Sequence, residues 1–380
     1  MKLEERLKQA YEGTAPAEPG EEGAYERFLR RRARYVGSVA AKVGLVLVLA
    51  VAVVAVAPRA LTDRQETLDG SRPVGRVDAR IALADRKYQE GAGLVVGEGA
   101  VWVDGLNGIW IERVDADSHQ VHRLRRLTGR SIVLADGILW SVAQRDQNPE
   151  RIPVGLIGLD LRTNRVIRGA DLSTVPDVAA GAGAVWVAED GVGVTQLDPR
   201  TGQVLRRIRL PDASPLTHLA VGDGAVIGVG FGAPTVRIDP RSGRIVARLP
   251  VGSATNPATN VVIGHGSAWF LRVDGTVVRV DLRTNKVLAR IHALRDYPPP
   301  PPLPSSDYGP KVIAVSADAV WVADDTGAIV RIDPATNRVA GKLQVFPASP
   351  VLSLAEGEGA LWATTRNGQK AELARIDPAA

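Results

Sequence analysis

Five polar side chains stand at comparable points of the chain, and they are the residues best placed to do chemistry. They are Arg130, Asp177, His218, Asn260 and Lys311. Each lies nine or ten residues ahead of a recurring large apolar position. Two cations and an imidazole against one carboxylate favour a polar, anionic ligand, because charge-assisted hydrogen bonds are the strong ones. The alternative interpretation is a water-filled channel lined by polar groups that satisfy one another.

Catalytic and metal-binding signals are sparse in the rest of the chain. No two of the five His residues share a metal-ligand spacing with carboxylates, so we predict neither a metal nor a cofactor. A Gly-rich phosphate loop after a strand and a Ser nucleophile elbow are both missing from the sequence. Asp324-Asp325 and Glu189-Asp190 could hold a cation, although hairpin turns use the same residue types. Binding is therefore favoured over catalysis.

An internal repeat must position the five side chains. Two motifs alternate, one like GAGAVWVAED (Gly181–Asp190) and one like RIDPATNRV (Arg331–Val339). The aligned large apolar positions of the first motif are Trp102, Trp140, Trp186, Ile227, Trp269, Trp321 and Trp362. Each repeat reads as four short strands with Asp-Pro-x-Thr-Gly/Asn turns, and four strands in about 40 residues are typical of a β-propeller blade. One Trp per repeat would fill the wedge between neighbouring blades.

The last repeat lacks its fourth strand, and a matching segment occurs at the front of the propeller region. GRVDARIAL (Gly75–Leu83) matches GRIVARLPV (Gly243–Val251) almost position for position. The sequence therefore predicts an all-β fold, a seven-bladed β-propeller over residues 75–380 whose N-terminal strand closes the last blade. Such closure would leave no unpaired seam between the first and last blades.

The two motifs together resemble those of the bacterial YVTN/NHL-type propellers, including the virginiamycin B lyase-like group. The resemblance covers residues 75–380 and implies the propeller fold. This family mixes binding modules, extracellular sensor domains and a few enzymes, so a lyase- or hydrolase-like enzyme is the alternative to a binding, sensing or scaffolding role. Lyase relatives use a His and acidic residues around a magnesium ion at the channel mouth. His218 with Asp177 partly matches that arrangement, and no further motif residue carries over.

The N-terminal region predicts a membrane anchor. Residues 1–34 form a polar tail, with a short helix and a linker of disordered composition, and residues 35–57 form an apolar run interrupted by Lys42. The Arg cluster before this run predicts a cytoplasmic N-terminus, a stalk at 58–74 and an extracytoplasmic propeller at the cell membrane. A cleaved signal peptide ending at Ala57 is the alternative, and Pro58 and the long polar tail disfavour it.

Loop lengths predict which face of the propeller binds its partner or ligand. The longest inserts, Ala143–Gly155 and the Pro-rich Arg295–Pro310, belong to connections on the same face, and binding residues concentrate on such loops. Neutral drift at a tolerant edge is the alternative. The expected partners are a protein or a small polar ligand on this face, together with the membrane. Nucleic acid is excluded, because the net charge of +5 is modest and no basic stripe interleaved with aromatics follows the Arg cluster.

Overall fold

The structure is a computed structural model, and the residues it describes belong to one compact unit, Thr67–Ala380. They are residues 74–83, 93–104, 110–124, 130–143, 155–173, 175, 177–210, 216–230, 234–253, 255–294, 312–347, 349–367 and 370–378. The predicted tail and anchor at 1–34 and 35–57 lie outside these ranges. Across the described ranges, no helix has the length and apolar character needed to cross a membrane.

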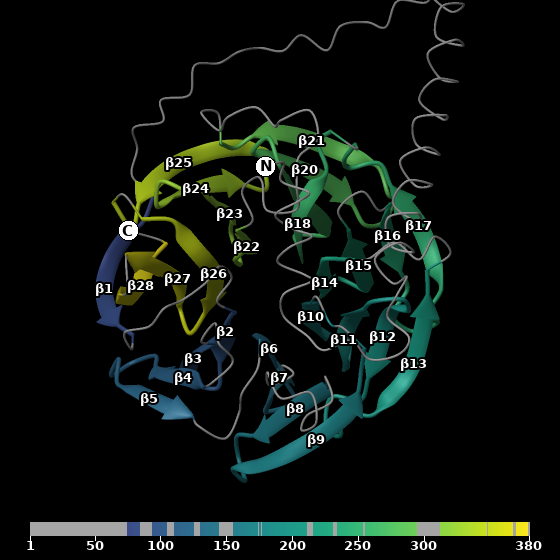
Figure 1. Cartoon of the computed structure of the whole chain (residues 1–380). Helices are drawn as coiled ribbons and strands as arrows, with labels where there is room; N and C mark the ends of the chain where they lie inside the picture. The colour runs from purple at the N-terminus through teal and green to yellow at the C-terminus, as the bar shows by residue number, and fades with distance from the viewer. Residues whose placement is uncertain are drawn as a thin grey trace, which may run out of the picture. The chain divides into compact units, whose positions relative to one another are not determined.

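Seven four-stranded antiparallel sheets stand around a central axis, which confirms the predicted all-β, seven-bladed propeller (Figure 1). The innermost strands are β2 (Leu94–Gly97), β6 (Arg130–Ala135), β10 (Asp177–Gly181), β14 (His218–Gly222), β18 (Ala258–Gly264), β22 (Ile313–Val315) and β26 (Val351–Gly357). The second strands are β3 (Ala100–Asp104), β7 (Ile138–Ala143), β11 (Ala184–Glu189), β15 (Ala225–Val229), β19 (Ser267–Arg272), β23 (Val320–Ala323) and β27 (Ala360–Asn367). We number the blades one to seven in this order.

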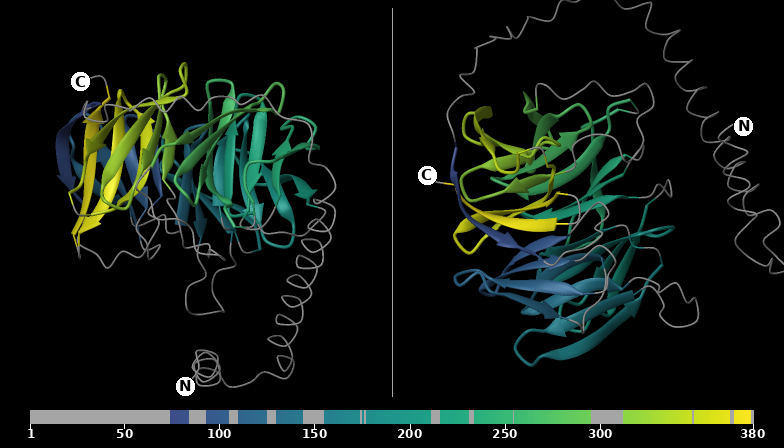
Figure 2. Two further views of the ribbon diagram at one scale, coloured as in Figure 1. Left: turned by 90° about the horizontal axis from the view of Figure 1, so that it is seen from above. Right: turned by 60° about the vertical axis from the view of Figure 1, so that its left-hand side comes forward.

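The two outer strands of each blade follow the same pattern. The third strands are β4 (Ile111–Asp115), β8 (Gly155–Asp160), β12 (Gly193–Leu197), β16 (Thr235–Ile238), β20 (Thr276–Asp281), β24 (Ala328–Asp333) and β28 (Lys370–Asp377). The outermost strands are β5 (Val121–Leu124), β9 (Arg165–Asp171), β13 (Val204–Arg209), β17 (Ile245–Leu249), β21 (Val287–His292), β25 (Arg338–Gln344) and β1 (Arg76–Ala82). Seen edge-on, the strands of the propeller run between its two faces (Figure 2).

The two faces differ in their connections. On one, which we call the turn face, lie the inner turns, which join the first and second strands of each blade, and the outer turns, which join the third and fourth. The opposite face, the loop face, carries the second-to-third connections and the links between blades. The two long inserts join β7 to β8 and β21 to β22, so both belong to the loop face as predicted, although most of their residues lie outside the described ranges.

The predicted closure is confirmed, because β1 is the outermost strand of the seventh blade. β1 pairs antiparallel with β28, and Val77 stands opposite Ile376 while Ile81 stands opposite Leu373. Ile81 is buried in a cluster with Trp362 of its own blade and Val101 of the first blade. Arg80 also donates a 2.5 Å hydrogen bond to Glu372. The first and last described strands are therefore held together in one sheet.

The repeated Trp residues fill the spaces between blades, as predicted. Trp140, Trp186, Trp269, Trp321 and Trp362 are fully buried, and Trp102 is only 3% exposed. Trp269, for example, lies in a cluster that spans Leu271 of blade five and Val320 of blade six. Its indole N–H donates to the carbonyl of Gly264 at 3.1 Å, so the polar end of the ring is also satisfied.

The outer turns are stabilised by an Asp at their first position. Asp198, for example, accepts hydrogen bonds from the backbone N–H groups of Arg200 and Thr201 and from the Thr201 hydroxyl. These bonds favour the ionised carboxylate and lower the pKa of Asp198. The same geometry recurs at Asp115, whose pKa falls to about 2 chiefly through the Ser118 N–H.

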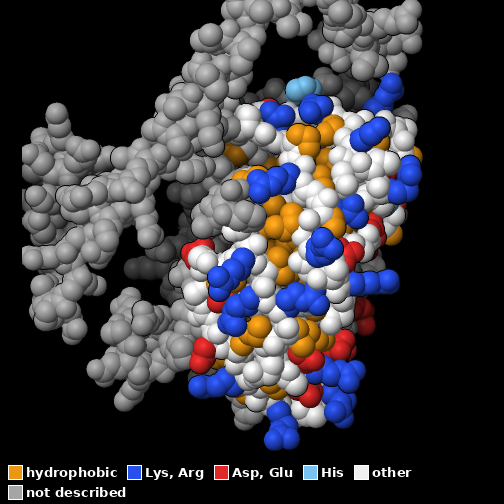
Figure 3. Space-filling view, turned by 90° about the vertical axis from the view of Figure 1, so that its right-hand side faces the viewer, with side chains coloured by type: hydrophobic (Ala, Val, Ile, Leu, Met, Phe, Trp, Pro, Cys, Tyr) orange, Lys and Arg blue, Asp and Glu red, His pale blue; other side chains and the backbone are white. Residues whose placement is uncertain are grey.

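The outer rim of blades three to five exposes apolar side chains among cations. Leu205, Val246 and Leu288 are each at least half exposed, and Figure 3 shows Lys and Arg side chains around apolar patches on this side. The strands β13, β17 and β21 contain Arg residues and no Asp or Glu. Charged side chains on edge strands discourage pairing with other chains, which accounts for this pattern.

Candidate functional site

The structure places four of the five polar residues singled out by their spacing at corresponding ends of the innermost strands, and we call this end of the channel its mouth. Asp177 is the first residue of β10 and His218 the first of β14, while Asn260 lies near the start of β18. Arg130 begins β6, but the structure does not describe its side chain, and Lys311 lies outside the described ranges. Blade repetition thus puts the starts of these four strands at the loop face of the channel.

The described side chains at the mouth contact neighbouring protein groups. The Asp177 carboxylate accepts a 2.8 Å hydrogen bond from the backbone N–H of Leu219, which connects blade three to blade four. Burial raises the pKa of Asp177 to about 7, although that hydrogen bond acts in the opposite direction. His218 Nδ1 lies 3.2 Å from the Thr217 hydroxyl, and Asn260 Oδ1 accepts from the N–H of Val261 at 2.7 Å. A carboxyl group that titrates near neutrality can hold or release a proton there.

The acidic pairs considered as cation sites serve the blades instead. Glu189 accepts hydrogen bonds from the Ser173 N–H at 3.1 Å and the Thr195 hydroxyl at 2.5 Å. Asp324 accepts from the N–H groups of Thr326 and Ala328 within its hairpin. Within the described ranges, no three His, Asp or Glu side chains are grouped so that they could hold a metal ion.

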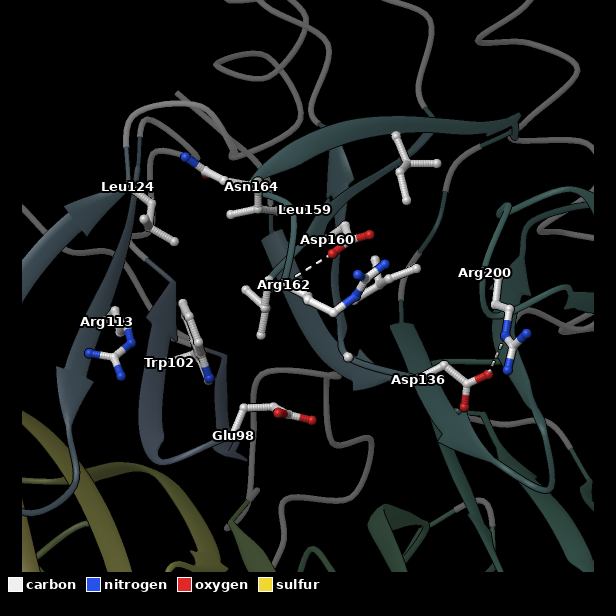
Figure 4. A pocket seen from close by; sticks show the side chains of 14 residues that line it. Glu98, Trp102, Arg113, Leu124, Asp136, Leu159, Asp160, Arg162, Asn164 and Arg200 are labelled. Atoms are coloured by element: carbon white, nitrogen blue, oxygen red, sulfur yellow. Dashed lines mark hydrogen bonds and ion pairs between the residues drawn. The ribbon is translucent and has the colours of Figure 1, made fainter.

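A cleft of about 840 Å³ opens between blades one and two on the turn face. Its blade-one side is lined by Glu98 of the inner turn, Trp102 of β3 and Arg113 of β4. Arg162 and Asn164, from the outer turn of blade two, line the other side (Figure 4). Sequence reasoning missed this cleft, because it directed attention to the loop face.

Inner turns of neighbouring blades are joined at other junctions by an acidic side chain. Glu358 of blade seven accepts from the N–H of Gly99 in blade one at 2.9 Å. Asp223 of blade four accepts from the N–H of Gly266 in blade five at 3.0 Å. We call this contact the inner tether.

At two of the described junctions, an Arg on the third strand of one blade joins the outer turn of the next. Arg237 of blade four donates to Asn285 Oδ1 in the outer turn of blade five at 2.8 Å. Arg279 of blade five donates to Asn337 Oδ1 of blade six at 2.7 Å. We call this contact the outer tether.

The junction of blades one and two has the residue types for both tethers but makes neither. Glu98 and Gly137 occupy the inner-tether positions, and Arg113 and Asn164 occupy the outer-tether positions. In the described part of the chain, no hydrogen bond joins the members of either pair. The Arg113 guanidinium lies 5.7 Å from the Trp102 ring centre, as the tethered Arg279 lies 4.6 Å from that of Trp269, and 3.4 Å from an Asp115 oxygen. The cleft is therefore the space that closed tethers would narrow.

The next junction is closed in a different way. Trp140 donates from its indole N–H to the carbonyl of Pro199 in blade three at 2.8 Å. Its ring lies so close to Gly158 and Gly202 that a Cβ at either glycine would stand within 2.8 Å of ring atoms. In blade two, Gly158 stands at the outer-tether position of the Arg, and Trp140 makes the contact to blade three in its place. This contact limits the cleft on the side of blade three.

The charged side chains of the cleft differ in how closely they are paired. Arg200 is paired with Asp136 at 3.2 Å, and Asp160 accepts from the N–H groups of Thr163 and Arg162. The Thr163 N–H lowers the pKa of Asp160, so this carboxyl remains ionised within its own turn. Arg113 donates to Asp115 at 3.4 Å, and among the described contacts the Arg162 guanidinium makes no hydrogen bond or ion pair with a carboxylate.

Comparisons with known proteins support the propeller fold and assign no activity. No protein-family model matches the sequence, and no curated protein matches it. Among solved structures, the chain is similar to the crystal structure of the computationally designed Ika8 protein. The two share 13% identity over 78% of this chain and 100% of that one, with a TM-score of 0.54. At this identity the likeness shows the propeller fold alone, and the YVTN/NHL resemblance stays a prediction.

Proposed function

We propose that this protein is a binding module in which the propeller captures a small polar or amphiphilic ligand. The observation that carries the proposal is the open cleft between blades one and two. Its volume of about 840 Å³ lies within the range of ligand pockets, roughly 300–1,000 Å³. Apolar Leu124 and Leu159 line it together with seven polar side chains, six of them charged, so it offers apolar surface beside groups that can orient a polar ligand. Propellers commonly serve binding or scaffold roles.

A cleft-filling substitution tests this proposal. Leu124→Trp places a larger side chain at the cleft wall, while Leu288→Trp enlarges an exposed leucine on the outer strand β21 as a matched control. We expect at least one compound in a panel of carboxylates, phosphates, amines and sugars to raise the Tm of the wild type and of Leu288→Trp. The same compound should have no effect on Leu124→Trp, since ligand stabilisation requires binding to the folded state. A panel that stabilises none of these proteins, or stabilises Leu124→Trp equally, contradicts the proposal.

The channel mouth is a second candidate site, as a binding surface or as the centre of a propeller enzyme. The specific observation in its favour is Asp177, whose pKa of about 7 suits proton transfer at the start of the strand next to His218. The same panel separates the two sites. A compound whose effect is lost in His218→Ala and retained in Leu124→Trp would assign binding to the mouth.

We further propose that the propeller is carried outside the cell membrane by a single-pass anchor at 35–57. The apolar run and the Arg cluster at residues 30–34 support this topology. Protease added to intact cells should then digest the propeller or the stalk and spare the N-terminal tail. A mature N-terminus at Pro58 in the purified protein, found by N-terminal sequencing, would replace the anchor with a cleaved signal peptide.

A further inference from the structure

The cleft differs from the closed junctions in how its tether groups are used. Where Arg237 meets Asn285, the guanidinium donates and the amide oxygen accepts, so each satisfies the other. At the open junction, Arg113 and Asn164 face one space without a hydrogen bond between them. Both side chains carry N–H groups that can donate to a third partner between them.

We propose that the cleft binds an aliphatic ligand that carries one carboxylate or phosphate group, held between Arg113 and Asn164. The proposal rests on the binding function assigned to the cleft above. The ligand's anionic oxygens take the position that the amide oxygen of Asn285 or Asn337 fills at the closed junctions. The ligand thereby supplies the missing outer tether between blades one and two.

Two guanidinium groups at the outer end of the cleft can bind an anion, beside the Asp160 carboxylate, which accepts hydrogen bonds from N–H groups of its own turn. Arg113 and Arg162 both line the cleft; the Arg113 guanidinium donates to Asp115 at 3.4 Å, and among the described contacts the Arg162 guanidinium makes no hydrogen bond or ion pair with a carboxylate. An anion that accepts from Arg113 and from the Asn164 amide makes charge-assisted hydrogen bonds, which are about twice as strong as neutral ones.

The other residues of the cleft favour a ligand with a hydrocarbon chain and only one charged group. Leu124, Leu159 and Ile167 line the cleft and offer apolar surface to a hydrocarbon chain. Glu98 stands at the inner end, and Arg200 is already paired with Asp136. A second anionic group would therefore meet a carboxylate there, which is unfavourable.

The test uses two matched substitutions in the full-length protein. Asn164→Gly removes the cleft amide, and Asn285→Gly removes the same group from a closed tether. Both residues have positive φ, of 55° and 59°, and glycine occupies the aligned positions Gly202 and Gly243 with φ of 66° and 68°. Each substitution therefore preserves the turn and removes only the side chain.

Two measurements decide the outcome. Without ligand, we expect Asn285→Gly to lower the Tm by about 2 °C, as loss of one hydrogen bond does in a domain of this size, and Asn164→Gly to leave it unchanged. By calorimetry, octanoate or octyl phosphate should bind the wild type and Asn285→Gly alike, and at least tenfold more weakly to Asn164→Gly. Octanol and acetate, which lack the charge and the chain respectively, should bind at least tenfold more weakly than the better of the two amphiphiles.

Several results would overturn the proposal. An equal loss of Tm in both variants would mean that Arg113 and Asn164 form a closed tether in solution. Unchanged affinity in Asn164→Gly would remove Asn164 from the site. If neither amphiphile binds, while another compound binds the wild type and fails to bind Leu124→Trp, the cleft is a binding site and the proposed ligand class is wrong. Binding of either amphiphile, with the loss in Asn164→Gly, supports the proposal, and the tighter of the two identifies the anionic group.

Discussion

Removal of residues 1–83 is expected to destroy the folded ring, whereas removal of residues 1–69 should leave it intact. The longer deletion takes away β1, the outermost strand of the seventh blade, and leaves the backbone groups of β28 unpaired along one edge. It also removes Ile81 and Leu83, which are buried against Trp362 and Val101. An exposed edge next to newly exposed apolar surface favours aggregation.

Size-exclusion chromatography and thermal unfolding of the two truncated proteins measure the difference. We expect the shorter deletion to give a monodisperse protein with a cooperative transition, and the longer one to aggregate or unfold at a much lower temperature. A triple substitution of Val77, Ile81 and Leu83 to Ser in the full chain should act in the same direction. Indistinguishable solubility and Tm for the two deletions would mean that β1 contributes nothing to closure.

The stability of the ring should fall as pH rises from about 4 to about 7, and Asp177 should account for the fall. Its folded-state pKa of about 7 lies above its ordinary value of 3.8, because its carboxyl group is buried. The folded state therefore binds the proton more tightly than the unfolded state. The contribution is fully present below about pH 4 and is lost progressively until the pH exceeds about 7.

Asp177→Asn should remove this loss, because its amide oxygen can still accept from the Leu219 N–H without carrying charge. We expect the substitution to stabilise the protein at pH 8 by about 1–4 kcal/mol and to have little effect at pH 4, from about 1.4 kcal/mol per unit of pKa difference. Denaturant unfolding at both pH values measures it.

Asp239→Asn is the matched control with the opposite sign. The Ser242 N–H and hydroxyl lower the pKa of Asp239, so its contribution is present at neutral pH and is lost as the pH falls below about 4. Its substitution should therefore destabilise the protein at pH 8. The prediction is contradicted if the free energy of unfolding of the wild type does not change between pH 5 and 8, or if Asp177→Asn and the wild type depend on pH in the same way. Either result would show that ionisation of Asp177 does not destabilise the folded state.

The propeller fold could be predicted from the sequence because each pattern that indicates it lies within a single blade. The alternating strands, the Asp-led outer turns and the Trp in each wedge repeat within about 40 residues, and the match of Gly75–Leu83 to Gly243–Val251 identifies the closing strand. The open junction is different. Glu98 and Glu358 occupy the same position of the same motif, yet only Glu358 reaches the next blade. Whether a tether closes depends on the distance between two blades, which neither blade's sequence encodes.

The candidate mouth shows a similar limit. Asp177 and His218 begin neighbouring inner strands, which agrees with their equal distance from the repeated large apolar position. The repeat could not show that the Asp177 carboxylate is hydrogen-bonded to Leu219, since that partner belongs to the next blade and lies 42 residues away. The tether positions themselves were within reach of the sequence, because an Arg on the third strand and an Asn ending the outer turn recur in several blades.

The pairing of β1 with β28 also sets a time order for folding. Arg80 and Glu372, which meet across this pair, are separated by 292 residues. At synthesis rates of about 5–20 residues per second, β1 leaves the ribosome roughly 15–60 s before its partner exists. During that interval its apolar side chains have no native strand to cover them, while blades one to six can already assemble. The final step closes a loop of 292 residues, about three-quarters of the chain, so we expect ring closure to be the slowest folding event and the stage at which a chaperone is most needed.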